Sequence, residues 1–291
     1  MKKKMRRILS FIVILGSALM LFTACSNGDK VSKTENEGKV AKTYTEDGSI
    51  EGALEGVELS VGTTGLFAPF SYYDHDGSTL IGYDMDFLNE LQKILGFTIA
   101  GGTVKNMDYS ALTTSVAKGK LDMALAALCA TDERKEVMNF SNIYYDSGLI
   151  IAVNKEMSPK EITGVDFLKS GNYTVAVEKG TASHIYAQKN LPAESIEVHD
   201  TITTAYESLE QGKVDVLIQD HPGVAYYIKT KSGTKLETVG EEFNNGQAPY
   251  AIAVSFDTSE EYPELVDILN KAIEELEENG TIDALNSKWF E

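Results

Sequence analysis

The chain has 291 residues and carries 44 acidic against 26 basic side chains, a formal net charge of −18 at pH 7. This acidic balance argues against nucleic acid as a partner, because neutralising phosphates requires a basic face. No metal-ligand spacing and no glycine-rich nucleotide loop is present, so we expect no cofactor.

Residues 1–24 are typical of a secretory signal peptide. Five Lys and Arg residues stand before an apolar run, 8–22, that is too short for a comfortable transmembrane helix. The small residues Thr23 and Ala24 then precede Cys25, which resembles a bacterial lipobox, although Phe22 stands where Leu is usual. We expect lipidation at Cys25, with plain secretion as the alternative.

Residues 25–54 are predicted to form a lipidated, flexible tether that holds a domain off the outer face of the cell membrane. Residues 26–49 are rich in Lys, Glu, Thr, Ser and Gly and offer almost nothing to bury. With Cys25 lipidated, Cys129 is a lone thiol in an apolar run. It is expected to be a small buried residue rather than a nucleophile.

From residue 57 onward, short apolar strands alternate with amphipathic helices, a pattern that predicts βαβ units and α/β architecture. The predicted strands are 57–61, 97–104, 123–128, 149–153, 173–177, 195–198, 214–219 and 250–256. The predicted helices are 84–95, 110–118, 182–190, 203–211, 262–279 and 281–290.

The stretch 121–134, LDMALAALCATDER, predicts a buried strand that runs into a helix start. Such a junction places backbone N–H groups and the guanidinium of Arg134 at the carboxyl edge of a sheet, where a carboxylate can bind. The alternative is an ordinary turn in which Arg134 is solvated or paired with Glu133 or Glu136.

Two segments have similar sequences and occupy equivalent places in the two series of strands and helices. Residues 119–123 read Gly-Lys-Leu-Asp-Met, and residues 212–216 read Gly-Lys-Val-Asp-Val. Each follows a predicted helix and begins a strand. This similarity indicates two similar lobes.

Several ordered motifs between residues 57 and 290 resemble the bacterial extracellular amino-acid-binding proteins that feed ABC importers (solute-binding protein family 3). These motifs are Ala68-Pro69-Phe70, Gly82-Tyr83-Asp84-Met85-Asp86, Asp122 through Arg134, Asn139-Phe140-Ser141, Tyr144-Tyr145, Gly180-Thr181, Asp220, Asn279-Gly280-Thr281 and Lys288-Trp289-Phe290. The resemblance implies a two-lobed clamp, each lobe a parallel-type sheet with flanking helices, joined by two hinge crossings near 144–148 and 246–250. Lobe 1 would be 55–147 with 251–291, and lobe 2 would be 148–250.

The resemblance also implies roles for particular residues around a free amino acid. Arg134 would hold the ligand carboxylate with the backbone N–H groups of Cys129 and Ala182 and with Thr181. Asp220 and the carbonyl of Ala127 would bind the ammonium. The set of expected ligand-binding residues is Phe67, Tyr109, Ala127, Cys129, Arg134, Glu178, Thr181, Ala182 and Asp220.

The residues do not determine the identity of the ligand side chain. Phe67 and Tyr109 would enclose its stem. The family often has an acid at Thr64 when the ligand is basic, which argues against a cation, whereas Glu178 would welcome a hydrogen-bond donor. Binders in this family often have Gly at Ala127 and Ala182, so the extra methyl groups here should narrow the pocket. They often have a hydroxyl at Cys129, so one side-chain bond to the ligand carboxylate should be missing here. We expect a small polar amino acid.

Two other functions remain open. Relatives on this fold include dehydratases of small acids, and only Glu178, Lys179 and His221 could supply acid–base chemistry here. A sensory ligand-binding module would normally be joined to a transmembrane or kinase segment. We expect a monomeric binding protein, not an enzyme, with a free amino acid and an ABC permease as partners.

Overall fold

The structure is a computed structural model that describes residues 48–245 and 249–291. The predicted signal peptide, Cys25 and residues 25–47 of the predicted tether lie outside the described residues. The second hinge crossing lies partly outside them. Ile50, Ala53 and Leu54, placed in the tether by the sequence, are buried in a hydrophobic cluster. Packing therefore begins before Glu55.

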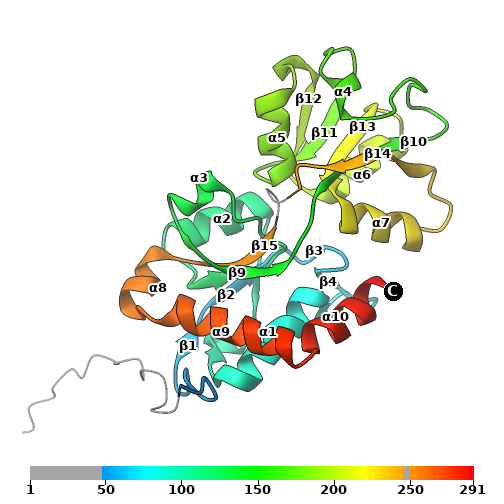
Figure 1. Ribbon diagram of the computed structural model, residues 1–291. Coiled ribbons are helices and arrows are strands. Elements are labelled where there is room, and N and C mark those ends of the chain that lie inside the picture. Colours follow the sequence, from blue (N-terminus) through cyan, green and yellow to red (C-terminus); the bar gives the residue numbers. More distant parts are fainter. Residues whose placement is uncertain (1–47, 246–248) are drawn as a thin grey trace, which may run out of the picture. The chain divides into compact units, whose positions relative to one another are not determined.

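Two five-stranded sheets form the framework (Figure 1). The first has the order β7-β2-β8-β15-β9, made of Lys105–Asn106, Val61–Thr63, Met123–Ala124, Tyr250–Val254 and Asn139–Tyr145. The second has the order β12-β11-β13-β10-β14, made of Ile196–His199, Val175–Glu178, Val216–Asp220, Leu149–Asn154 and Leu236–Phe243. We refer to these as the sheets of lobe 1 and lobe 2.

The two sheets share one topology. In each sheet, four strands run in the same direction and one, β15 in lobe 1 and β10 in lobe 2, is antiparallel to both of its neighbours. The chain passes from lobe 1 to lobe 2 between β9 and β10 and returns between β14 and β15. The prediction of a two-lobed α/β fold is confirmed, but the sheets are mixed because β15 and β10, the first strands after the two crossings, run antiparallel to their neighbours. The exact lobe bounds stay a prediction.

The similar segments 119–123 and 212–216 make the same structural contact, once in each lobe. Asp122, just before β8, accepts a hydrogen bond from the backbone N–H of Ser60 at 2.6 Å. Asp215, just before β13, accepts one from the backbone N–H of Thr174 at 2.8 Å. Ser60 and Thr174 directly precede β2 and β11, the parallel partners of those strands. Each carboxylate thus ties together the starts of two parallel strands.

Helices flank both sheets, and several differ from prediction. The helices are α1 Tyr83–Leu95, α2 Tyr109–Ala117, α3 Asp132–Lys135, α4 Val165–Leu168, α5 Ala182–Asn190, α6 Ile202–Glu210, α7 His221–Thr230, α8 Phe256–Glu261, α9 Leu265–Glu278 and α10 Thr281–Phe290. The single predicted helix 262–279 is wrong at its start, since α8 ends before Tyr262 and α9 begins at Leu265. None of the helices in the described part of the chain is both long and apolar enough to cross a membrane.

Two short sheets and two short 3-10 turns complete the lobes. Two short sheets pair β1 (Glu58–Leu59) with β6 (Thr98–Ile99), and β3 (Leu66–Phe67) with β4 (Ser71–Tyr73) and β5 (Leu80–Ile81). Two short 3-10 turns are Ala100–Gly102, in lobe 1, and Ala193–Ser195, in lobe 2. The predicted strand 97–104 is therefore wrong beyond Ile99, because glycines at positive φ turn the chain there.

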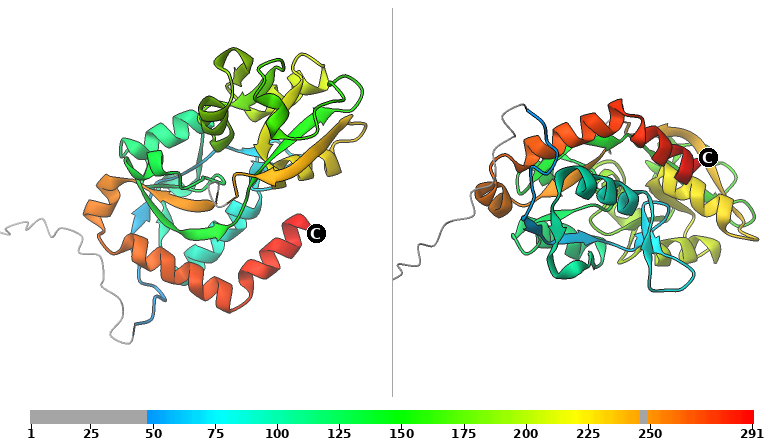
Figure 2. Two further views of the ribbon diagram at one scale, coloured as in Figure 1. Left: turned by 45° about the horizontal axis from the view of Figure 1, so that its top comes forward. Right: turned by 90° about the horizontal axis from the view of Figure 1, so that it is seen from below.

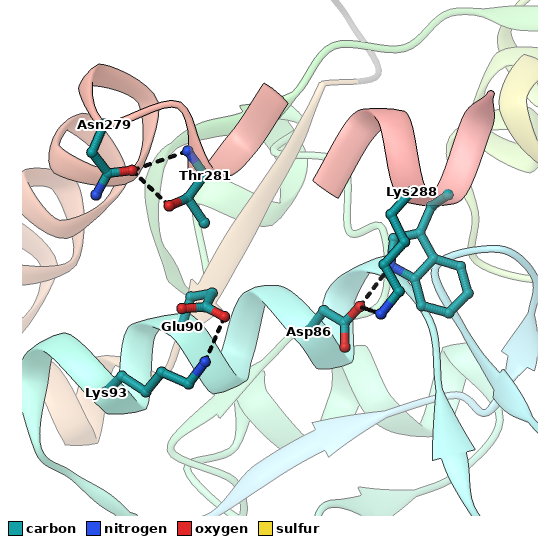
Figure 3. Close-up of polar contacts among 7 residues, drawn as sticks. Asp86, Glu90, Lys93, Asn279, Thr281 and Lys288 are labelled. Atoms are coloured by element: carbon teal, nitrogen blue, oxygen red, sulfur yellow. Dashed lines mark hydrogen bonds and ion pairs between the residues drawn. The ribbon is translucent and has the colours of Figure 1, made fainter. Parts of the chain in front are cut away.

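The last helix is fastened to the first. Lys288 Nζ and Trp289 Nε1 both donate to Asp86 Oδ2, at 2.6 and 2.8 Å, and Figure 3 shows Lys288 reaching Asp86 on α1. At the other end of α10, Asn279 accepts bonds from the backbone and hydroxyl of Thr281. Figure 2 shows α1, α9 and α10 together on lobe 1. The C-terminal helix is therefore a fixed part of this lobe.

Gly82 offers a direct test of this framework. It precedes α1 at φ 131°, and a Cβ there would lie 2.1 Å from the carbonyl oxygen of Phe70. We expect Gly82→Ala to lower the free energy of unfolding by about 2–4 kcal/mol in denaturant titration. Gly77→Ala is the matched control, because Gly77 also has positive φ but its Cβ would meet nothing. Equal losses in the two variants would contradict the packing argument.

Candidate functional site

A narrow, buried cavity lies between the two lobes. The cavity volume is about 10 Å³, which leaves room for about one water molecule. Its lining residues are Thr64, Leu66, Phe67, Tyr109, Ala126, Ala127, Glu178, Thr181, Ile202, Gln219 and Asp220. Six of the nine predicted site residues line it. Because no amino acid fits this space, binding requires the lobes or side chains to move.

Arg134 lies behind the cavity wall and connects the lobes. Its side chain donates to the carbonyl oxygens of Cys129 at 2.6 Å and of Gly180, in lobe 2, at 2.7 Å. Its guanidinium carbon also lies 5.3 Å from the ring centre of Tyr109. Arg134 is only 7% exposed. The predicted alternative of a solvated surface arginine is therefore wrong.

Local backbone geometry turns this arginine inward. Thr131 caps α3 by accepting from the backbone N–H of Arg134. Cys129 forms a bridge with Tyr250 that uses the N–H groups of the flanking residues Ala130 and Ala251. That arrangement directs the carbonyl of Cys129 away from Tyr250 and toward Arg134. Cys129 is buried, as expected for a small core residue.

Ala127 adopts a left-handed conformation, φ 48°, that alanine rarely takes. Its backbone N–H donates to Asp84 Oδ2 at 2.8 Å, and Tyr144 donates to the other carboxylate oxygen. Burial raises the pKa of Asp84 to about 6 against the effect of these two hydrogen bonds. The family's frequent glycine at this position is explained by the turn, which ends β8 after only two residues instead of the predicted six.

Asp220 stands at the N-cap of α7, yet its side chain makes no capping bond. Instead, Tyr250 donates to Oδ2 at 2.9 Å, and Oδ1 has no partner among the described residues. Burial raises the pKa of Asp220 to about 7, and the Tyr250 hydrogen bond and the charge of Arg134 oppose this only in part. An acceptor buried without a donor is costly, so this oxygen is suited to an incoming ammonium group.

Glu178 ends β11 and is a second buried carboxyl group in the cavity wall. Burial raises its pKa to about 8, with the backbone hydrogen bond from Ile202 opposing the rise and the charges of Asp220 and Asp108 adding to it. The alternative that Glu178 is a solvated loop acid is therefore wrong.

Thr181 and Ala182 begin α5 beside the cavity. The Thr181 hydroxyl donates to the carbonyl of Glu178 and accepts from the backbone N–H of His184 as the helix cap. That hydroxyl is therefore engaged in local structure. Ala182, Cys129 and Arg134 do not line the cavity. Ala182 borders a separate open groove of about 1040 Å³ whose charged side chains, such as Glu133 and Lys189, are exposed.

The cavity brings together more acceptors than donors. The carboxyl groups of Asp220 and Glu178 line it, and the side-chain oxygen of Gln219 also has no partner among the described residues, whereas the guanidinium of Arg134 lies outside the lining. Within residues 48–245 and 249–291, no group of three or more His, Cys, Asp or Glu side chains could hold a metal. This chemistry suits a ligand that carries both a carboxylate and nitrogen donors.

Several residues that shape the site were not predicted. Leu66, Ala126, Ile202 and Gln219 line it, and Tyr250 orients Asp220. The position of Gln219 in the site could have been predicted from the sequence, because it stands at the end of a buried strand beside Asp220. The role of Tyr250 could not, because it depends on a contact between β15 and β13, whose residues are 30 positions apart in the chain.

The family model of the bacterial extracellular solute-binding proteins, family 3, matches residues 59–291. The chain belongs to this family. Among curated family members, the L-cystine-binding protein TcyJ of Escherichia coli K12 is 28% identical over 253 residues, covering 87% of this chain and 90% of that protein.

Solved structures of similar proteins have the same fold. An ancestral arginine-binding protein matches in its arginine-bound form with a TM-score of 0.72 and 31% identity, over 83% of this chain and 100% of that one. In its glutamine-bound form the values are 0.71 and 32%, over 80% and 97%. An ancestral amino-acid-binding protein described as a precursor of cyclohexadienyl dehydratase matches at 0.70 and 28%, over 80% and 96%.

The buried charge of Asp220 predicts a pH-dependent stability. Because its pKa is raised by folding, the stability that it contributes is full below about pH 4 and is lost as pH rises through about 7. Asp220→Asn removes this loss. We expect the ligand-free variant to match wild type near pH 4 and to exceed it by about 1–4 kcal/mol at pH 8, measured by urea titration. Asp200→Asn, an exposed change on the same lobe, is the control. A difference that is constant with pH would refute the argument.

Proposed function

We propose that this protein binds a free amino acid between its lobes, outside the cell, and delivers it to an ABC importer. The observation that carries the proposal is the opposed pair in the cavity region: a buried cation, Arg134, on lobe 1 and an acceptor oxygen of Asp220 on lobe 2. A free amino acid offers a carboxylate to the first and an ammonium to the second.

The two groups give the ligand a way to close the lobes. Arg134 in lobe 1 already contacts the Gly180 carbonyl of lobe 2, at 2.7 Å. A carboxylate at Arg134 and an ammonium at Asp220 are both satisfied only when the lobes approach each other. That difference in contacts between open and closed states shifts the equilibrium toward closure.

Charge balance favours a ligand whose side chain carries a nitrogen donor. Burial raises the pKa of Glu178 to about 8, so this carboxyl group is largely protonated near pH 7 when nothing compensates its charge. A side-chain cation at Glu178 would allow it to ionise and would balance its charge, and a neutral N–H donor would satisfy its oxygen by a hydrogen bond. Cystine, arginine and glutamine, named for the similar proteins, all carry such nitrogen groups. This extends the preference for a small polar ligand to larger donors.

We further propose that Cys25 is lipidated and that the tether keeps the protein on the outer face of the membrane, next to its permease. The support is the basic, apolar and small-residue order of 1–25.

Binding, rather than catalysis, is the function that the site supports best. Of the three acid–base candidates, only Glu178 lines the cavity. Lys179 is more than half exposed near Asp200, and His221 Nδ1 contacts Glu242 at 2.6 Å. A general acid or base needs hydrogen-bond reach of the substrate. The dehydratase precursor on this fold binds amino acids by its own description, so a product assay with small acids is the test of the enzyme alternative.

Arg134→Ala tests the carboxylate site. Loss of a buried charge-assisted contact should weaken binding of the best amino-acid ligand by about 2–5 kcal/mol in isothermal titration calorimetry. The ligand is first found by a thermal-shift screen of the common L-amino acids and L-cystine. Lys135→Ala is the control, because Lys135 is the next residue in the chain and its side chain is exposed. Unchanged affinity in a folded Arg134→Ala protein would eliminate the assignment.

Glu178→Gln tests the side-chain site. We expect affinity for L-arginine to fall about 10–100-fold relative to affinity for L-glutamine, because an amide can accept a hydrogen bond but cannot compensate a full charge. Glu194→Gln, an exposed change on the same lobe, is the control. If the preference between the two amino acids does not change, Glu178 does not read the side chain.

A further inference from the structure

Helix α7 of lobe 2 carries a row of three residues that contact lobe 1. Gly223, Tyr226 and Lys229 are spaced three apart, so they lie along one side of the helix. We call this row the α7 face. Apart from Phe67, neither these three residues nor their lobe 1 partners line the cavity.

Gly223 allows the closest of these approaches. A Cβ at this position would lie 2.3 Å from Cε2 of Phe67 and 2.8 Å from its Cζ. The Phe67 ring has little freedom to retreat, because it is buried and stacks on Phe70 at 5.5 Å. Glycine in a helix costs stability relative to alanine. The contact with Phe67 is the structural reason why a glycine is suitable here.

Tyr226 and Lys229 continue the contact away from the cavity. The hydroxyls of Tyr226 and Tyr72 lie 3.1 Å apart, and their rings are 6.0 Å apart. Tyr72 lies on β4 and also packs against Trp289 of α10. Lys229 Nζ donates to the main-chain oxygen of Glu291 at 2.9 Å. Tyr72 packs on α10, and Glu291 directly follows it. This helix is held to α1 by the hydrogen bonds of Lys288 and Trp289 to Asp86.

We propose that the α7 face is a closure surface that sets the affinity of the site for every amino acid it accepts, without selecting among them. The inference rests on the proposed amino-acid binding. The apparent dissociation constant scales inversely with the fraction of protein able to close. A residue that contacts only the other lobe changes that fraction, so it changes all affinities by one common factor. A residue that contacts the ligand changes their ratio.

Three variants test this with the full chain. Gly223→Ala obstructs the approach of Phe67, and Tyr226→Phe removes the bond to Tyr72 while keeping the ring. Tyr227→Phe is the matched control on the same helix, because its hydroxyl contacts Glu210 within lobe 2. Dissociation constants are measured by calorimetry for each of the twenty common L-amino acids and L-cystine that binds wild type. Thermal unfolding of the ligand-free proteins is measured in parallel.

We expect Gly223→Ala to weaken every ligand about tenfold or more, with ligand-free unfolding temperature equal to or above that of wild type. Tyr226→Phe should weaken every ligand by about 2–10-fold, and Tyr227→Phe should change none. Ratios between ligands should stay constant in Tyr226→Phe and Tyr227→Phe, whose partners do not line the cavity. Gly223→Ala tests only the common loss of affinity, because Phe67 also lines the cavity.

Altered ratios in Tyr226→Phe, or unchanged affinities in both test variants, would overturn the closure surface while leaving amino-acid binding intact. Binding of no amino acid by wild type would overturn the proposed function and the inference together.

Discussion

The buried guanidinium of Arg134 is the constraint on which the site depends. An arginine cannot lose its charge at physiological pH, so removing it from water is tolerable only if neighbouring groups replace the lost hydrogen bonds. Here two carbonyl oxygens and the face of Tyr109 do so, and one of those carbonyls belongs to lobe 2. The buried charge is therefore stabilised both by the backbone at Cys129 and by a contact from lobe 2.

Holding that backbone requires a second buried charge-bearing group. Asp84 fixes the left-handed turn at Ala127 through its N–H, and its own carboxylate is secured by Tyr144. Asp84 starts the first long helix, so α1 positions the site as well as covering the sheet. Asp220 and Glu178 add buried carboxyls on the opposite lobe. Such groups are unfavourable for the ligand-free fold and favourable for binding, which is the usual balance at functional sites.

The sequence was sufficient for features that depend on local pattern. Helices α5 and α10 begin and end at the predicted residues, and the paired Asp122 and Asp215 indicated two like lobes. Strands β9 and β14 and helix α7 were not predicted, because half-exposed strands and a weakly amphipathic helix that begins His-Pro-Gly carry little periodicity. Residues such as Arg134 and Asp220 were predicted through family motifs. Their partners Gly180 and Tyr250 were not, because those contacts join segments far apart in the chain.

Helix α7 connects the recognition of the ligand to the movement of the lobes. Asp220 stands at its N-cap, and Gly223, Tyr226 and Lys229 follow along one side. A helix of ten residues spans only about 15 Å and behaves as one rigid element. An ammonium that draws Asp220 toward lobe 1 therefore moves the α7 face by the same displacement, and no intermediate residue is needed to transmit it. Phe67 takes part in both functions, because it lines the cavity and also packs against Gly223. Tyr226 and Lys229 lie apart from the cavity, so the pocket can vary in which amino acid it accepts while their closing contacts stay the same.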